Sequence, residues 1–247
     1  MKINKKKYVI VTGVNGQLGT DLVRKLYEKE YFIIGIDIKG KPHIKIKDYY
    51  NCNITNENEI VSFFKYLKKD KIFPEILINN AGIGTYGNIK TRTTEEIIKV
   101  MNVNMLGCIN MIKNYYIHMS NLKKIKKIIN ISSIYGNYPP DFQIYKNNKN
   151  RYSSEIYGST KAGIIQLTKY FAKNFSKENF IVNCISPGGI KNKKLQTSMF
   201  IKNYSKNVPL RRMANTSDIV MPILFLCSND SNYINGHNLI VDGGLSC

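Results

Sequence analysis

The chain of 247 residues is poor in the residue types that build metal centres and disulfide frameworks. Its three histidines are scattered, and its five cysteines show neither paired nor metal-like spacing. We therefore predict no metal site and a reducing, cytoplasmic location. No apolar run approaches the roughly 20 residues that span a membrane, so we expect no membrane partner. The apolar run near the N-terminus is too short for a signal peptide and is interpreted as a strand. The histidines and cysteines are His43, His118, His237, Cys52, Cys108, Cys184, Cys227 and Cys247.

Arginine is also scarce, although the formal net charge is +20. Nearly all positive charge comes from lysines in short runs at the ends of expected helices and strands. A strongly basic chain can bind nucleic acid or an anionic surface. Here no RNA- or DNA-binding motif accompanies the charge, and abundant Asn and Ile suggest the bias of an AT-rich genome. We predict no nucleic-acid partner; a salt-sensitive gel shift would support the alternative.

Apolar strand-like runs alternate with helical patterns along the whole chain. We expect strands within 8–12, 31–40, 43–55, 75–82, 126–133, 180–186 and 238–244, and helices after the glycine turn at 13–19 and within 56–69, 93–121, 155–175 and 216–228. Polar segments 136–154 and 190–208 are predicted loops, the first at the active site and the second a mobile substrate loop. Such alternation predicts an α/β fold, a Rossmann-like doubly wound parallel sheet with helices on both faces. Residues 1–247 form one domain in this interpretation.

A glycine-rich turn follows the first expected strand and opens a helix. Gly13, Gly16 and Gly19 are spaced by three, so the strict G-x-G-x-x-G pattern of dinucleotide sites is not met. A strand, a glycine turn and a helix N-terminus nevertheless present free N–H groups and a positive dipole end to an anion. The turn therefore predicts a phosphate site, with a purely structural turn as the alternative.

An acidic residue ends the second expected strand. Asp37 lies eighteen residues after Gly19, where a carboxylate accepts hydrogen bonds from a ribose diol and repels a 2′-phosphate. This position favours NAD over NADP, without excluding NADP; the alternative is a solvated loop aspartate. Asn53 and Ile54 follow the next strand, where they are expected to flank an adenine.

The segment from Ser133 to Lys161 carries the candidate chemistry. Tyr157 and Lys161 are four apart on a predicted helix, so both side chains leave the same face. A nearby ammonium should lower the pKa of the phenol and make it a general acid/base, with Ser133 bonding the same substrate oxygen. The spacing also occurs at Tyr86/Lys90 and Tyr145/Lys149, but neither begins an amphipathic helix. An ordinary packed tyrosine remains the alternative for Tyr157.

Two asparagines lie inside the apolar stretch expected to form a helix at 93–121. A buried Asn there is unfavourable unless its amide is hydrogen-bonded. Asn104 should therefore either tie the helix to a strand or serve the site; Asn102 is its neighbour. Gly13, Asp37, Asn80, Ser133 and Pro187 all lie at expected strand ends, where ligands bind on such sheets.

Taken together, the motifs resemble those of the short-chain dehydrogenase/reductase family, of the single-domain type, over nearly the whole chain. The matching segments are TGVNGQLG (12–19), Asp37, NNAG (79–82), NVNMLG (102–107), NISS (130–133), YGSTK (157–161), NCISPGGI (183–190), PLRRM (209–213) and VDGG (241–244). The resemblance implies a catalytic tetrad of Asn104, Ser133, Tyr157 and Lys161. It implies hydride transfer with NAD(P), and a homotetramer or dimer that uses the Tyr157 helix and the C-terminal strand.

Cofactor contacts are likewise implied by the resemblance. They are Gly13, Asn15, Gly16, Gln17, Leu18, Gly19, Asp37, Ile38, Asn53, Ile54, Asn80, Ala81, Gly82, Tyr157, Lys161, Pro187, Gly188 and Ile190. Three features depart from the family pattern. Gln17 stands where single-domain members usually have Gly, and Asn53 replaces the usual Asp, although its carbonyl oxygen can still accept from an adenine amino group. Ser133 and Tyr157 are 24 positions apart, an unusually long separation, so the extra loop should lie near the substrate mouth.

The SSIYG start, the long loop and the NCISPGGI segment resemble a bacterial branch found with genes for surface sugars, including flagellin glycans. We expect an oxidoreductase of a secondary alcohol or carbonyl on a sugar or sugar phosphate. Basic residues near the loops are hypothesised to bind its phosphate or carboxylate. They are Lys146, Lys149, Arg151, Lys191, Lys193, Lys194, Arg211 and Arg212. The alternatives are a 3-oxoacyl-type or general carbonyl reductase, with apolar lips around its pocket, and a non-catalytic cofactor sensor.

Overall fold

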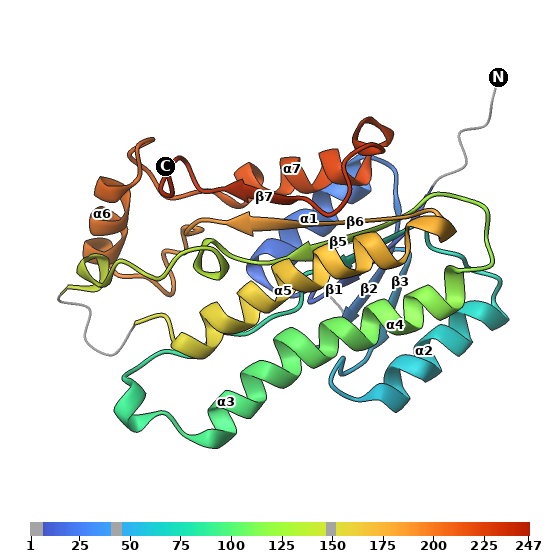
Figure 1. The fold of residues 1–247 in the computed structure, drawn as a ribbon, viewed down its shortest axis with the longest axis horizontal. Helices are drawn as coiled ribbons and strands as arrows, with labels where there is room; N and C mark the ends of the chain where they lie inside the picture. The colour runs from blue at the N-terminus through green and yellow to red at the C-terminus, as the bar shows by residue number, and fades with distance from the viewer. Residues whose placement is uncertain (1–6, 41–45, 147–151) are drawn as a thin grey trace.

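The computed structural model describes residues 7–40, 46–146 and 152–247. They contain one seven-stranded sheet in which every neighbouring pair is parallel, in the order β3-β2-β1-β4-β5-β6-β7 (Figure 1). Its strands are β1 (Tyr8–Thr12), β2 (Phe32–Asp37), β3 (Asp48–Asn51), β4 (Ile76–Asn79), β5 (Lys126–Ile131), β6 (Phe180–Pro187) and β7 (Asn238–Val241). The predicted doubly wound sheet is confirmed. The strand order reverses between β1 and β4, which is where such folds bind ligands.

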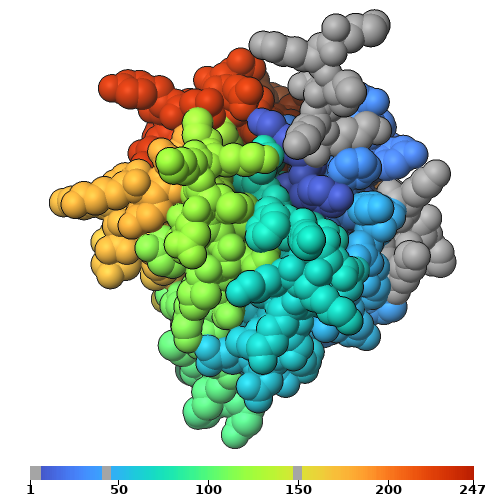
Figure 2. Space-filling view, turned by 90° about the vertical axis from the view of Figure 1, so that its right-hand side faces the viewer, coloured from blue at the N-terminus to red at the C-terminus, as the bar shows by residue number. Residues whose placement is uncertain are grey.

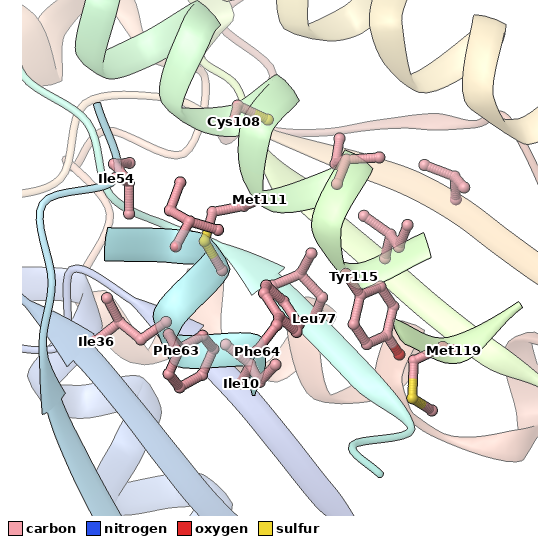
Figure 3. Packing of buried hydrophobic residues seen from close by; sticks show 14 of the residues in the cluster. Ile10, Ile36, Ile54, Phe63, Phe64, Leu77, Cys108, Met111, Tyr115 and Met119 are labelled. Atoms are coloured by element: carbon pink, nitrogen blue, oxygen red, sulfur yellow. The ribbon is translucent and has the colours of Figure 1, made fainter. Parts of the chain in front are cut away.

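The helices cover both faces of the sheet. They are α1 (Gln17–Glu28), α2 (Glu57–Lys69), α3 (Thr94–Met101), α4 (Gly107–Met119), α5 (Glu155–Asn174), α6 (Ser198–Asn207) and α7 (Thr216–Cys227). One core lies between the sheet and α2, α4 and α5, and a second lies between the sheet and α1 and α7. Figure 3 shows the first core, where Phe63 and Phe64 from α2 and Met111 and Tyr115 from α4 face the strands. Because both faces are covered, β1, β4 and β5 are buried along almost their whole length.

The segment predicted as one or two helices at 93–121 is a continuous helical run with a π-helical turn, η2 (Asn102–Leu106), between α3 and α4. A π turn inserts an extra residue into the helix and is common at functional sites. Gly107 follows it directly, and a Cβ there would lie 2.7 Å from the Cδ1 atom of Ile54. The turn carries Asn104, which is buried.

The two predicted loops contain more structure than the sequence suggests. Segment 190–208 is not wholly a loop, because α6 occupies Ser198–Asn207. Phe200, Ile201 and Tyr204 share a face of α6 and pack on a small third core with Tyr145. Segment 136–154 contains the 3-10 turn η4 (Phe142–Tyr145), after η3 (Ile134–Gly136); residues 147–151 lie outside the described part. Lysines hid the apolar spacing of 190–208, and polar residues with two prolines hid that of 136–154.

The carboxyl ends of the strands meet at the end of the molecule that carries α6 (Figure 1). Figure 2 shows the opposite end, where the connections preceding β4, β5, β6 and β7 come together. There the buried Lys127 donates through Nζ to the Ser231 hydroxyl at 2.8 Å and so ties β5 to the α7–β7 connection. In the described chain, no helix is both long enough and apolar enough to cross a membrane.

Candidate functional site

A cavity of about 390 Å³ opens at the carboxyl ends of β4, β5 and β6. Of the residues predicted from the sequence, ten line it: Gln17, Leu18, Asn80, Gly82, Ser133, Tyr157, Lys161, Pro187, Gly188 and Ile190. The predicted residues Gly13, Asn15, Gly16, Gly19, Asp37, Ile38, Asn53, Ile54, Ala81 and Asn104 do not line it. Among the described residues, no cluster of three or more His, Cys, Asp or Glu side chains is placed to hold a metal ion.

The glycine turn is packed directly against the loop that follows β4. Gly13 has a φ of +68°, and a Cβ on it would lie 2.8 Å from the Cα atom of Ala81. The Asn80 amide donates to the Thr12 and Gly13 carbonyls at 3.0 and 2.9 Å. A Cβ at Gly19 would lie 2.1 Å from the Gly13 carbonyl oxygen, so a side chain at this position is excluded. Asn80 and Ala81 therefore hold the shape of the turn.

The N-terminus of α1 fits a bound phosphate. Its N-cap is Gly16, which provides no side-chain hydrogen bond to the first turn. The leading N–H groups of a helix need partners from elsewhere, and a phosphate at this end supplies them and complements the helix dipole.

Asp37 lies beside this turn at the end of β2. Its carboxylate accepts the N–H groups of Asn15 at 2.9 Å and Lys39 at 3.0 Å. Asn15 also donates through its amide to the Gly40 carbonyl at 2.8 Å, so turn and strand end are joined twice. The neighbouring Ile38 side chain is 64% exposed. A carboxylate with remaining lone pairs beside a phosphate site fits a ribose diol.

The residues after β3 are less open than expected. The Asn53 carbonyl oxygen already accepts the N–H and the hydroxyl of Thr55, at 3.0 and 2.9 Å, so its predicted bond to an adenine amino group would need one of these to break. Ile54 is buried and its side chain packs on Gly107. Both residues reach the expected strand end. In the structure both residues interact with protein groups. Asn53 closes a turn with Thr55, and Ile54 occupies a core position.

Tyr157 and Lys161 leave the same side of α5, as predicted, and both face the cavity. The Lys161 ammonium donates to the Ile131 carbonyl at 2.8 Å and lies 5.7 Å from the centroid of the Tyr157 ring. Ser133, just beyond β5, hydrogen-bonds the Tyr157 phenol. Ser154 caps α5 through the Tyr157 N–H at 3.2 Å and fixes where the helix begins.

The predicted lowering of the tyrosine pKa is wrong for the site as it stands. Burial raises the pKa of Tyr157, and the hydrogen bond from Ser133 only partly opposes this rise. Burial also lowers the pKa of Lys161 to about 8. The ammonium was expected to lower the tyrosine pKa, but both groups also lose water. Desolvation has the larger effect on their pKa values here.

The buried amide of Asn104 is hydrogen-bonded, as the sequence analysis required, but its partners lie in a loop and a helix rather than in a strand. Its carbonyl oxygen accepts the Ile83 N–H at 2.9 Å, and its amide donates to the Ile83 carbonyl at 2.9 Å and to the Thr160 hydroxyl at 3.0 Å. It thus ties the π turn to the loop after β4 and to α5. A Cβ on Gly82 would lie 3.4 Å from the Asn104 oxygen and 3.3 Å from the Lys161 nitrogen, so both groups flank this glycine.

The described basic residues near the loops do not line the cavity. Among the described lining residues, Lys161 alone carries a positive charge. Arg212 forms a salt bridge with Asp218 in the first turn of α7, and Arg211 donates to the Lys206 carbonyl at 2.6 Å. Lys146, Lys191, Lys193 and Lys194 are exposed, while Lys149 and Arg151 lie outside the described residues. The described basic residues therefore give no support for an anion site in the cavity.

Four tyrosines around the cavity were missed by the sequence analysis: Tyr86, Tyr135, Tyr145 and Tyr204. Tyr145 was set aside because its segment lacks a helical period, yet it is 4% exposed and its phenol lies 2.8 Å from that of Tyr135. Tyr204 on α6 accepts the Gly189 N–H at 2.6 Å. The unusual length of 136–154 was the available signal, since an insertion at the substrate mouth supplies lining residues.

Gln17 connects the glycine turn to the loop after β6. Its amide donates to the Lys191 carbonyl at 2.7 Å and accepts from the Asn192 amide at 2.8 Å. The same loop is braced by Gln196, which donates to the Ile190 carbonyl at 2.9 Å. A glycine at position 17 could form neither side-chain bond. This departure from the family pattern therefore creates a bridge between the two sides of the cofactor region.

Comparisons with known proteins agree with this geometry. A family profile described as "Enoyl-(Acyl carrier protein) reductase" matches residues 38–246. Carbonyl reductase family member 4 of Xenopus laevis is 31% identical over 79% of this chain and 76% of its own. The 3-oxoacyl-[acyl-carrier-protein] reductase FabG of Buchnera aphidicola is 29% identical over 99% of both chains. A short-chain dehydrogenase from Leptospira borgpetersenii, solved with bound NAD+, is 38% identical over 98% of this chain and 93% of that one, with a TM-score of 0.92.

Burial of Lys161 predicts a measurable dependence of stability on pH. The pKa is about 8 when folded and 10.5 when exposed, so between these pH values the unfolded chain binds a proton that the folded chain lacks. Stability from this group therefore rises with pH through this window. Relative to Lys161→Met, wild type should gain roughly 3 kcal/mol from pH 8 to 10.5. Urea unfolding of both proteins at several pH values measures the difference; a constant difference would contradict the buried ammonium.

Because Gln17 links the glycine turn to the loop after β6, we expect NADH to dissociate more slowly from wild type than from Gln17→Ala. Two neutral hydrogen bonds are lost, so the NADH dissociation rate should rise about three- to tenfold. Stopped-flow fluorescence measures this rate. Lys191→Ala is the matched control, because the bridge uses the Lys191 carbonyl and not its side chain. Equal release from wild type and Gln17→Ala would show that the bridge does not restrain the cofactor.

Proposed function

Since this chain belongs to the short-chain dehydrogenase/reductase family of NAD(P)-dependent oxidoreductases, we propose that it is an NAD-dependent reductase of an uncharged ketone, or dehydrogenase of the corresponding secondary alcohol. The observation that carries the proposal is the position of Ser133, Tyr157 and Lys161 around one cavity at the carboxyl ends of the strands. A sensor without turnover has no need of all three groups there.

In the proposed reaction, Tyr157 and Ser133 bond the substrate oxygen, and Tyr157 exchanges a proton with it. Lys161 holds the nicotinamide ribose, and Asn104 fixes the wall formed by Ile83 and Thr160. The bound nicotinamide supplies or accepts the hydride at the substrate carbon. On reduction the carbonyl carbon gains this hydride while its oxygen takes the phenol proton, and oxidation reverses both transfers.

The raised pKa of Tyr157 sets how the two directions of the proposed reaction should depend on pH. A phenol that keeps its proton at neutral pH is ready to donate it to a developing alkoxide. Oxidation would first require removal of that proton. Oxidation should therefore become faster as the pH rises, whereas the equilibrium between ketone and alcohol is set by the reactants.

The lining of the cavity supports an uncharged substrate. Ile83, Ile134, Leu195, Phe200 and Met213 give it apolar walls, and Lys161 is the one cation among the described lining residues. Apolar walls were the feature expected of a 3-oxoacyl-type or general carbonyl reductase, so this alternative is now the first candidate. A neutral sugar is the second candidate, because phenol groups also line the walls. A sugar phosphate and a place in surface glycan biosynthesis stay predictions of the sequence resemblance.

NAD preference rests on Asp37. Its carboxylate lies beside the glycine turn, where a 2′-phosphate would meet a like charge. We expect NADH to bind at least about tenfold more tightly than NADPH, and Asp37→Ala to reduce this preference. Fluorescence titration with both cofactors measures it. Preference for NADPH in wild type would mean that nearby lysines outweigh Asp37.

The same protein then serves in a substrate screen with neutral sugars, sugar phosphates and 3-oxoacyl thioesters. Tyr157→Phe is the inactive control, expected to bind NADH like wild type while turning over nothing. Failure to bind either cofactor would undercut the enzymatic function, whereas turnover by Tyr157→Phe would remove the assigned acid.

A homo-oligomer is also proposed, formed through α5 and the edge strand β7. An unpaired edge favours pairing with another chain, and Tyr170 on α5 is 59% exposed. We expect a dimer or tetramer by light scattering and a lower mass for Tyr170→Lys. Tyr27→Lys on α1, 49% exposed on the other face of the sheet, is the control. A monomeric wild type would be the contrary result.

A further inference from the structure

Two phenols outside the tetrad form a hydrogen-bonded pair at the cavity. Tyr135 comes from η3, directly after Ser133, and Tyr145 comes from η4 in the long loop. Their oxygens are 2.8 Å apart, and both side chains line the same cavity as Tyr157. The two residues are 10 positions apart in the sequence. They form a pair because the loop folds back over the end of β5.

A count of protons shows that the pair retains one hydrogen-bond donor. Each phenol carries one proton, and the bond between them uses one of the two. The Ser153 N–H donates to the Tyr145 oxygen and uses no phenol proton. In the described part of the chain, neither hydroxyl has an acceptor other than the partner phenol. Whichever tyrosine donates within the pair, the proton of the other has no acceptor among the described residues and can be donated to a ligand.

The position of this donor is fixed by packing. The Tyr145 ring lies 5.4 Å from the Phe200 ring of α6 and 5.6 Å from that of Tyr152. Ile144 beside it is 1% exposed and anchors η4 in the third core. A donor held in place in this way loses little conformational entropy when it binds a ligand.

We propose that the Tyr135–Tyr145 pair recognises a second oxygen on the substrate, one that does not react, and so selects hydroxylated ketones and alcohols over simple ones. This inference rests on the proposed function and narrows its substrate class. A buried donor that remains unpaired is costly, so a substrate without the second oxygen is disfavoured as well as less tightly held.

The test uses cyclohexanol and cyclohexane-1,2-, 1,3- and 1,4-diol as probes, with NAD+ as oxidant. Each diol adds one hydroxyl to the same ring, at a different distance from the reacting carbon. The variants are Tyr135→Phe, Tyr145→Phe and the double variant, which keep all rings. Tyr138→Phe is the matched control, because Tyr138 lies in the same loop, is 47% exposed and is not among the residues lining the cavity.

Wild type should favour at least one diol over cyclohexanol by about tenfold in kcat/KM, the worth of one hydrogen bond. Either single variant leaves one phenol proton, so each should keep part of this preference. The double variant should lose it through a raised KM for the diols, so that diols and cyclohexanol are used about equally. A merely structural role would change both substrates alike.

Three outcomes would overturn the inference: equal use of cyclohexanol and all diols by wild type, retained diol preference in the double variant, or equal loss of turnover on every probe. NADH binding without turnover of any probe would also overturn it, since a pocket for small hydroxylated rings must oxidise one of them. Absence of NADH binding would instead contradict the proposed function itself. The fluorescence titration measures that binding separately.

Discussion

Burying the ammonium of Lys161 beside a phenol costs free energy, because both groups lose water. The surrounding backbone offsets part of this cost. The Ile131 carbonyl, at the end of β5, accepts from the ammonium, and Gly82 leaves room for it beside Asn104. Gly136 allows η3 to lie against α5, since a Cβ there would be 2.6 Å from the Lys161 carbonyl carbon. The strand end, the glycines and the π turn are arranged around one buried charge.

The sequence predicted most of this arrangement because the relevant signals are local. A β-branched run before Gly13 indicates a strand, and four-residue spacing puts Tyr157 and Lys161 on one side of a helix. Strand ends of a parallel sheet share one edge, so Asn80, Ser133 and Pro187 had to meet. Asn104 could be identified because a buried amide must find partners, although the identity of Ile83 and Thr160 as those partners required the structure.

What the sequence could not predict depends on contacts between distant segments. The pKa of Tyr157 follows from how completely the fold excludes water, which no spacing reveals. The polar neighbours of Tyr145 predicted a loop. Its ring nevertheless packs against that of Phe200, which lies more than fifty positions later in the sequence. The hypothesis that basic residues near the loops bind a substrate anion gained no support for the same reason. Charge near a site in sequence says little about whether a side chain enters the cavity, and Arg212 reaches Asp218 instead.

Two of the three departures from the family pattern, Gln17 and the long loop, meet in the loop after β6. On the cofactor side, Gln17 holds this loop through Lys191 and Asn192. On the substrate side, Gly189 in the same loop donates to Tyr204, whose helix also carries the Phe200 ring against Tyr145. A change in the glycine turn can therefore reach the phenol pair through one continuous set of contacts. Gln17 in the glycine turn and Tyr145 in the long loop are therefore connected through the loop after β6, and both line the same cavity.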